Sequence, residues 1–100
     1  MMSRSVTVVN ELGMHARAAA KFVHLAARFE ARIRVAAEGR EMDGKSIMGL
    51  LLLAAACGAV VTISADGRDE ADAVEALALL VSTGFSEDDS VETGAAGGAR

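Results

Sequence analysis

The chain has 100 residues, of which 52% are hydrophobic, and a formal net charge of −4 with one cysteine and no tryptophan or tyrosine. This length supports one domain with a single core, and the lack of a basic excess and of tryptophan or tyrosine argues against a nucleic-acid binder. The single Cys57 cannot form an internal disulfide, which is typical of a protein of the reducing cytoplasm. Because Cys57 lies in an apolar run, we expect its side chain to be buried.

The first half of the chain predicts a strand, a helix and a hairpin. Alternation in SVTVV at 5–9 indicates a strand, and a helix follows His15. RIRV at 32–35 alternates strictly and predicts a second strand, which a turn near Gly39 joins to a short third strand around 40–42. The buried face expected for the helix consists of Ala19, Phe22, Val23 and Ala26.

The second half predicts a helix, a strand and a helix. The uncharged run 47–63 is shorter than the ~20 residues of a spanning helix, and at Gly58 it changes from leucine and alanine to the β-branched VVTIS. We therefore expect a helix over 46–57, a buried strand after it, and no membrane insertion. A last helix follows the turn at 65–70. Its expected buried face is Val74, Leu77, Leu80 and Val81.

The order β-α-β-β-α-β-α predicts an α/β (α+β) fold, an open-faced two-layer sandwich. Crossover connections make the first two strands parallel and the last two parallel, while the hairpin makes the second and third antiparallel. Placing the fourth strand between the first and the second gives a four-stranded antiparallel sheet of order 1-4-2-3 with the three helices on one face. We assign 1–85 to this domain and 86–100, with a net charge of −3, to a disordered acidic Gly/Ala-rich tail.

The stretch GMHARAAAKFV places His15 at the start of the first helix. Unpaired backbone N–H groups and the positive end of the helix dipole favour anions there, so a group on the imidazole would lie near the amides of Ala16, Arg17 and Ala18. The guanidinium of Arg17 suits phosphate oxygens, and Gly13 permits a sharp turn into the helix. These residues predict a histidine that accepts a phosphoryl group. The alternative is an ordinary surface histidine or a weak helix cap.

Other kinds of site have little support in the sequence. His15, His24 and Cys57 do not have the spacing of metal ligands, so we expect no metal and no other cofactor. A triad hydrolase would need a nucleophile elbow, which the sequence lacks.

GMHARAAAKFV and DGKSIMGLLLLAAACGAVVTISADGRDEADAVEAL, with their spacing, resemble the histidine-containing phosphocarrier family, HPr, of the sugar phosphotransferase system over about residues 4–85. The resemblance implies the open-faced sandwich and phosphorylation on Nδ1 of His15, with Arg17 assisting. It also implies a cytoplasmic, stoichiometric carrier, rather than a turnover enzyme, that takes phosphate from enzyme I, itself charged by phosphoenolpyruvate, and delivers it to IIA domains of sugar transporters. The family usually has proline where this chain has Ala18.

Two other functions remain open. One is a regulatory relative in a nitrogen-type or kinase-linked branch without sugar transport. The other is an interaction module that has kept the fold but no longer transfers phosphate. Intact His15 and Arg17 argue against the interaction module.

The helix predicted over 46–57 is apolar around its whole circumference, although one stripe is enough to cover a sheet. We expect Leu50, Leu53, Ala54 and Cys57 to face the sheet. The outward side would then carry an apolar interface, which in the resembling family docks partners; a dimer contact is the alternative, and we expect a monomer. The residues of that interface are Ile47, Met48, Leu51 and Leu52.

Ser46 has the position of an N-cap for this helix. In many bacteria of the resembling family the matching serine is phosphorylated by an ATP-dependent HPr kinase/phosphorylase, and KSIMG resembles those regulated members. The outer face of the first helix carries a row of basic residues. This row would bind acidic partner surfaces, or it is part of an ordinary solvated face. This row consists of Arg17, Lys21, His24 and Arg28.

Overall fold

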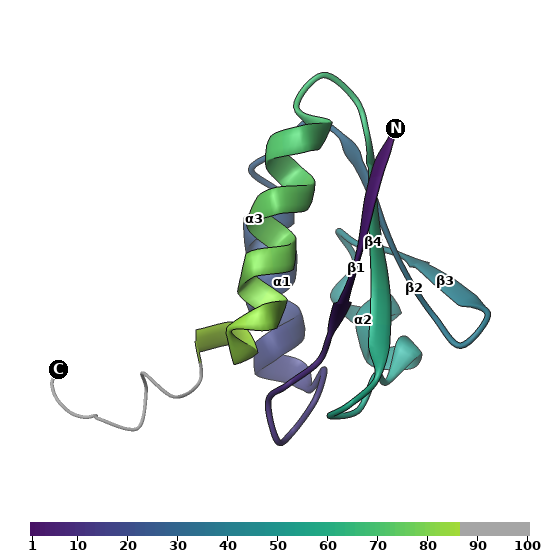
Figure 1. Cartoon of the computed structure of the whole chain (residues 1–100), viewed down its shortest axis with the longest axis vertical. Coiled ribbons are helices and arrows are strands. Elements are labelled where there is room, and N and C mark those ends of the chain that lie inside the picture. Colours follow the sequence, from purple (N-terminus) through teal and green to yellow (C-terminus); the bar gives the residue numbers. More distant parts are fainter. Residues whose placement is uncertain (87–100) are drawn as a thin grey trace, which may run out of the picture.

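A computed structural model describes residues 1–86 of the chain and shows a sheet with its helices packed against one face (Figure 1). The strands lie in the order β1-β4-β2-β3, and all neighbouring pairs are antiparallel, so the predicted fold is confirmed. In chain order the elements are β1 (Met2–Thr7), α1 (Ala16–Ala26), β2 (Arg32–Ala37), β3 (Arg40–Asp43), α2 (Ile47–Leu53), β4 (Val60–Asp66) and α3 (Glu70–Ser82).

The core lies between the central strands and the helices. In β2, Ile33 and Val35 are completely buried while Arg32 and Arg34 are exposed, as the alternation predicts. Val35 pairs with Ile63 of β4, which is also completely buried. The helices bury Ala18, Ala19, Phe22, Ala26, Val74, Leu77 and Val81. Two positions predicted to be buried, Val23 and Leu80, are only partly buried and pack at the edge of this core.

The second helix is shorter than predicted. It ends at Leu53, and Ala54 adopts the left-handed conformation at φ 54° and ψ 41°. One guanidinium nitrogen of Arg40 donates to the Leu52 carbonyl at 2.8 Å, which satisfies a carbonyl at the helix end. Residues 54–59 then form a loop. The high helix propensity of the run LLLLAAAC is therefore overridden by contacts from other parts of the chain.

This early end corrects two expectations about side chains. Ala54 and Cys57 were predicted to face the sheet, and both are exposed. Because 54–59 leaves the helix, the helical phase that placed these two residues on the buried face no longer applies. The thiol of Cys57 instead lies 3.7 Å from the Val9 carbonyl oxygen.

The end of the described region packs into the domain. Phe85 is completely buried, and its carbonyl oxygen accepts a hydrogen bond from Nζ of Lys21 at 2.8 Å. The acidic tail predicted for 86–100 lies outside the described residues, except for Ser86.

Asp69 connects the start of α3 to the turn between α1 and β2. Its two carboxylate oxygens accept from the backbone N–H groups of Glu30 and Ala31, each at 2.9 Å. The hydrogen bond from Glu30 is the largest cause that holds the pKa of Asp69 below its usual range. A carboxyl group with a lowered pKa in the folded state stabilises the fold above its unfolded pKa, and this contribution is lost as pH falls through the folded pKa.

We expect Asp69→Asn to flatten the acid limb of the stability curve. The free energy of unfolding of the wild type should fall more steeply than that of the variant between about pH 5 and about pH 2. Urea unfolding at several pH values measures the difference. Asp72→Asn, at an exposed position in the first turn of the same helix, is the control and should follow the wild type. Parallel curves for wild type and Asp69→Asn would contradict the assigned role.

Candidate functional site

The turn that leads into α1 is fixed by hydrogen bonds within itself and to a distant loop. The side-chain amide of Asn10 donates to the Gly13 carbonyl at 2.8 Å, and the backbone N–H of His15 donates to the same carbonyl at 2.9 Å. The N–H of Met14 donates to the Ala55 carbonyl at 2.8 Å. The loop before α1 is therefore attached to the loop that follows α2.

Gly13 is required in this turn for two reasons. Its φ is +69°, a left-handed conformation that favours glycine. A Cβ atom at this position would lie 2.6 Å from the Ala55 carbonyl oxygen, which is far closer than van der Waals contact. The glycine thus lets two backbones approach at the point where the chain enters the helix.

Asn10 belongs to this site, although the sequence pattern does not predict it. The residue is buried, at 7% exposure. Its only local signal is the spacing of an asparagine three residues before a glycine, which is common in turns. Its burial depends on packing that this spacing does not encode.

His15 is the N-cap residue of α1, with an extended backbone at φ −83° and ψ −179°. Its carbonyl accepts from Ala19 at 2.8 Å, and its imidazole Nδ1 accepts from the backbone N–H of Arg17 at 3.2 Å. A nitrogen that accepts a hydrogen bond presents a lone pair, so in the neutral ring the proton is on Nε2. The structure therefore places a nucleophilic ring nitrogen at the positive end of a helix.

The first turn of α1 supplies the backbone donors near that nitrogen. The N–H groups of Ala16, Arg17 and Ala18 belong to the first turn, where an α-helix has no internal acceptors. The Arg17 and Ala16 side chains are exposed, whereas Ala18 is completely buried. Packing of the Ala18 methyl group against the core therefore holds this turn without a proline ring.

A row of basic residues, called here the basic stripe, follows the exposed side of α1. Its last member, Arg28, was expected on the same helix face and instead lies in the turn after the helix, because α1 ends at Ala26. Three of its members are exposed, while Lys21 is half-buried and donates to the Phe85 carbonyl. No aspartate or glutamate occurs between Ala16 and Phe29. The stripe consists of Arg17, Lys21, His24 and Arg28.

Ser46 is the N-cap residue of α2, as predicted. Its backbone is extended at φ −119° and ψ 114°, and its Oγ accepts from the N–H of Gly49 at 3.0 Å. The Ser46 carbonyl accepts from Leu50 at 3.1 Å, the first helical hydrogen bond. The hydroxyl group thus has a structural role in starting the helix.

The outward side of α2 is apolar, but smaller than predicted. Ile47, Met48 and Leu52 are 39%, 64% and 56% exposed, and we call these three residues the apolar patch. Leu51 was expected among them and is instead half-buried against the core. The helix packs against α1 as well as against β2 and β3, so it buries a wider face than one sheet contact would need. Leu50 and Leu53 are buried, as predicted.

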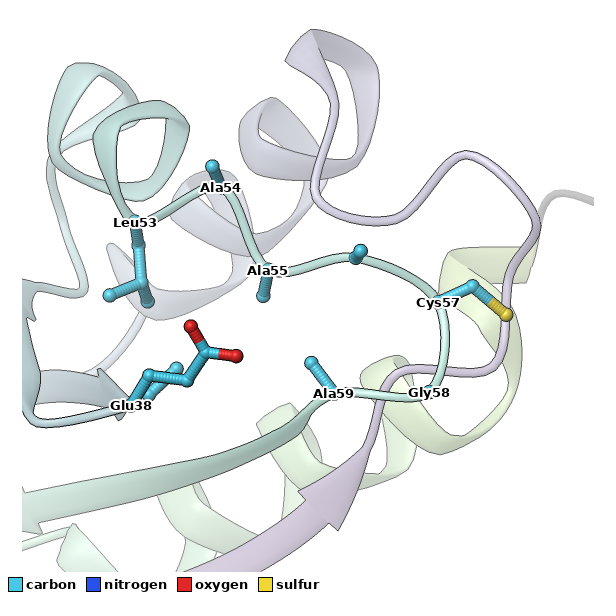
Figure 2. Close-up of a pocket in the computed structure, with 9 residues that line it drawn as sticks. Glu38, Leu53, Ala54, Ala55, Cys57, Gly58 and Ala59 are labelled. Carbon is cyan, nitrogen blue, oxygen red and sulfur yellow. The ribbon is translucent and has the colours of Figure 1, made fainter.

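A pocket of about 330 Å³ lies behind the loop that follows α2. Figure 2 shows the Glu38 carboxylate pointing into this space and the Cys57 side chain pointing away from it. Ala37, Glu38 and residues 53–59 line the pocket. His15 is not among them, so the imidazole site lies outside this pocket.

Residues 1–86 carry no metal-binding cluster and no helix able to span a membrane. Within this region no group of three or more His, Cys, Asp and Glu side chains is arranged to hold a metal ion. No helix in the same region has the length and apolar character required to cross a membrane.

Comparison with known proteins connects the site to one family. Residues 2–83 match the family model described as PTS HPr component phosphorylation site. The phosphocarrier protein HPr of Cupriavidus necator is 45% identical over 87 residues, which is 87% of this chain and 98% of that relative. The phosphocarrier protein NPr of Shewanella violacea is 37% identical over 86% of this chain and 94% of its own. The crystal structure of HPr-C-His from Thermoanaerobacter tengcongensis superposes with a TM-score of 0.84 at 39% identity, covering 87% of this chain and 98% of that one.

Proposed function

Because this chain belongs to the HPr family, the phosphocarriers of the phosphotransferase system, we propose that it accepts a phosphoryl group on Nδ1 of His15 and passes it to a second protein. The observation that carries the proposal is the position of this Nδ1 at the start of α1, 3.2 Å from the backbone nitrogen of Arg17. The helix dipole and the first-turn amides favour the anionic group that the reaction brings there.

The proposed step is a direct displacement at phosphorus. The Nδ1 lone pair of His15 attacks the phosphorus atom of a phosphohistidine on the donor, and the new N–P bond forms as the donor's N–P bond breaks. The donor imidazole leaves with the electron pair of that bond. Nδ1 carries no proton when it accepts from Arg17, so the attack requires no prior deprotonation at this atom. Arg17 is exposed two residues after His15, and its guanidinium can neutralise the phosphoryl oxygens.

Incubation with phosphoenolpyruvate and enzyme I, followed by intact-mass measurement, tests the proposal. We expect the mass of one phosphate to be added only when enzyme I is present. The adduct should be labile in acid and stable in base, as phosphohistidine is. A chain that stays unmodified under conditions that phosphorylate another HPr would refute the carrier function.

In this proposal enzyme I is the donor, IIA domains of sugar transporters are the acceptors, and the exchange takes place in the cytoplasm. The basic stripe follows α1, whose N-cap is His15, and the apolar patch lies on α2, whose N-cap is Ser46. Because these two helices pack against each other, the two surfaces can form a common docking surface. Such a surface combines an apolar centre with charges that suit acidic partners.

The similarity to an NPr supports a second candidate, a carrier in a nitrogen-type branch without sugar transport. The two candidates differ in the acceptor. Transfer rates from the phosphorylated chain to a sugar-type IIA domain and to a nitrogen-type IIA domain, measured side by side, distinguish them.

Met48→Asp should weaken the binding of enzyme I by about 1–3 kcal/mol, the usual range for an exposed interface anchor. Met48 is 64% exposed in the apolar patch, so the free energy of unfolding should change little. Calorimetric titration with enzyme I and urea unfolding measure the two quantities. Leu79→Asp, at an equally exposed position on α3, is the matched control and should bind normally. Equal losses of binding for both variants would rule out a specific role of the patch.

Ser46→Asp should slow phosphoryl transfer to His15 several-fold at low ionic strength. Aspartate can replace serine as the N-cap, so the fold is kept. The added charge lies next to Ile47 and Met48 of the apolar patch and would oppose an acidic partner. Raised salt should shrink the defect because it screens exposed charges.

The matched control is Ser46→Asn, which keeps the cap without the charge. Transfer rates for wild type and both variants, across enzyme I concentration and ionic strength, measure the effect. The same rate for the aspartate and asparagine variants would leave Ser46 with its capping role alone.

A further inference from the structure

The basic stripe begins two residues after His15, follows the exposed side of α1 and ends at Arg28 in the turn after that helix. It carries three formal positive charges, on Arg17, Lys21 and Arg28, in a segment that has no acidic residue. Arg17, His24 and Arg28 are exposed. A surface of this kind attracts any acidic segment that can reach it.

The last described residues are attached to the middle of that stripe. Nζ of Lys21 donates to the Phe85 carbonyl at 2.8 Å, and Phe85 itself is completely buried. Figure 1 shows α3, which leads to Phe85, lying alongside α1, and the two helices are in contact. The chain therefore leaves the described region at a fixed point next to Lys21.

The sequence that follows this point is acidic. Residues 86–92 read SEDDSVE, with four carboxylate side chains and no basic one. The match to the family model ends at residue 83, before these charges. The carboxylates belong to Glu87, Asp88, Asp89 and Glu92.

Chain geometry puts the whole stripe within reach of these carboxylates. Each residue of an extended chain spans at most about 3.3–3.6 Å. Along α1 the rise is only about 1.5 Å per residue, and Arg17 lies four positions before Lys21 on this helix. Arg28 lies seven positions after Lys21, in the turn that follows the helix. A segment that starts at Phe85 and carries its last carboxylate at Glu92 can therefore extend to either end of the stripe.

We propose that the acidic segment 87–92 is an internal ligand of the basic stripe and competes there with acidic surfaces of partner proteins. The competition, but not the contact, rests on the proposed carrier function. Each exposed ion pair is weak. Attachment at Phe85, however, gives the segment an effective concentration on the order of millimolar at the stripe. The contact is therefore partial and sensitive to salt, because the Debye length is only about 8 Å at physiological ionic strength.

The contact is tested by a nitroxide spin label at Ser90→Cys in the Cys57→Ser background of the full chain. We expect the label to broaden amide NMR signals along α1 at about 20 mM salt, with the effect reduced at about 0.5 M salt. Arg28, at the far end of the stripe, is the most informative position. Arg32 and Arg34, exposed on the open face of the sheet, are the reference for non-specific attraction.

The matched variant neutralises the segment without shortening it. Broadening at Arg28 should fall at least about threefold in this variant at low salt, since the ion pairs that hold the segment are lost. Equal broadening with charged and neutral segments, or equal broadening at Arg28 and at the sheet reference, would overturn the contact. The substitutions are Glu87→Gln, Asp88→Asn, Asp89→Asn and Glu92→Gln.

Phosphoryl transfer from enzyme I tests the competition separately. At low salt the neutralised chain should be phosphorylated about two- to fivefold faster than the wild type, and the two rates should converge at high salt. Equal rates at low salt would overturn the competition. If neither chain takes up phosphate, the carrier function and the competition with it fail, and the broadening still decides the contact. Normal uptake without a difference in broadening refutes the contact and leaves the carrier function intact.

Discussion

His15→Ala should abolish the uptake of phosphate from phosphoenolpyruvate and enzyme I, while His24→Ala should retain it. His15 presents Nδ1 at the start of α1, where the amides of the first turn have no helical acceptors. His24 lies on the same helix near its end, away from those donors. Intact mass and acid lability report the adduct, and the opposite pattern would refute the assignment of His15.

The alanine variant also removes a helix cap, which typically costs about 1 kcal/mol of stability. His15→Asn separates the two roles because asparagine is a good N-cap but has no imidazole. We expect the asparagine variant to unfold at nearly the wild-type urea concentration and to take up no phosphate. Phosphate uptake by this variant would place the acceptor elsewhere.

Gly13→Ala should destabilise the protein by about 3 kcal/mol or more, since it combines a left-handed backbone with a close backbone contact. The new Cβ would lie 2.6 Å from the Ala55 carbonyl oxygen, so the turn must move away from the loop after α2. That movement would break the Met14–Ala55 hydrogen bond and displace the His15 side chain. The rate of phosphoryl transfer should fall together with the stability.

Gly39→Ala is the matched control for this effect. Gly39 also has a positive φ, +81°, but among the described residues no heavy atom beyond Gly39 and its two chain neighbours lies within 4 Å of the position of a Cβ. The free energy of unfolding of the control should therefore fall only by the cost of a left-handed alanine, roughly 1–2 kcal/mol. The control should transfer phosphate normally. Urea unfolding and transfer rates of both variants decide the matter. Equal losses of stability would show that the contact with Ala55 has no role.

The features predicted correctly from the sequence are local ones. Alternation in 32–35 predicts a strand with Ile33 and Val35 on one face, because strand geometry alone fixes which side each residue faces, and the structure buries both. The positions of His15 and Ser46 as N-caps follow from their place immediately before an apolar periodic segment. The strand order followed from short connections and crossover rules, and the sheet confirms it.

The features that were missed depend on contacts between distant parts of the chain. Helix propensity extends through the alanine run after Leu53, but the Met14–Ala55 and Arg40–Leu52 hydrogen bonds draw that run into a loop. Helical periodicity with a single buried face predicts an exposed Leu51. The residue is half-buried because α2 packs against a helix as well as a sheet. The attachment of Phe85 to Lys21 has no local signal, since 64 positions separate the two residues.

The hydrogen bond from the Arg17 amide to Nδ1 of His15 has a consequence for the energetics of relay between proteins. The lone pair that caps the helix is also the one that would bond to phosphorus, so the proposed transfer exchanges one acceptor for another at the same amide. The donor group stays in place while the nitrogen acceptor is replaced by a phosphoryl oxygen, so little reorganisation energy is needed in either direction. A carrier built this way binds its cargo on a preformed anion site and releases it without refolding, which lowers the barrier to transfer in both directions.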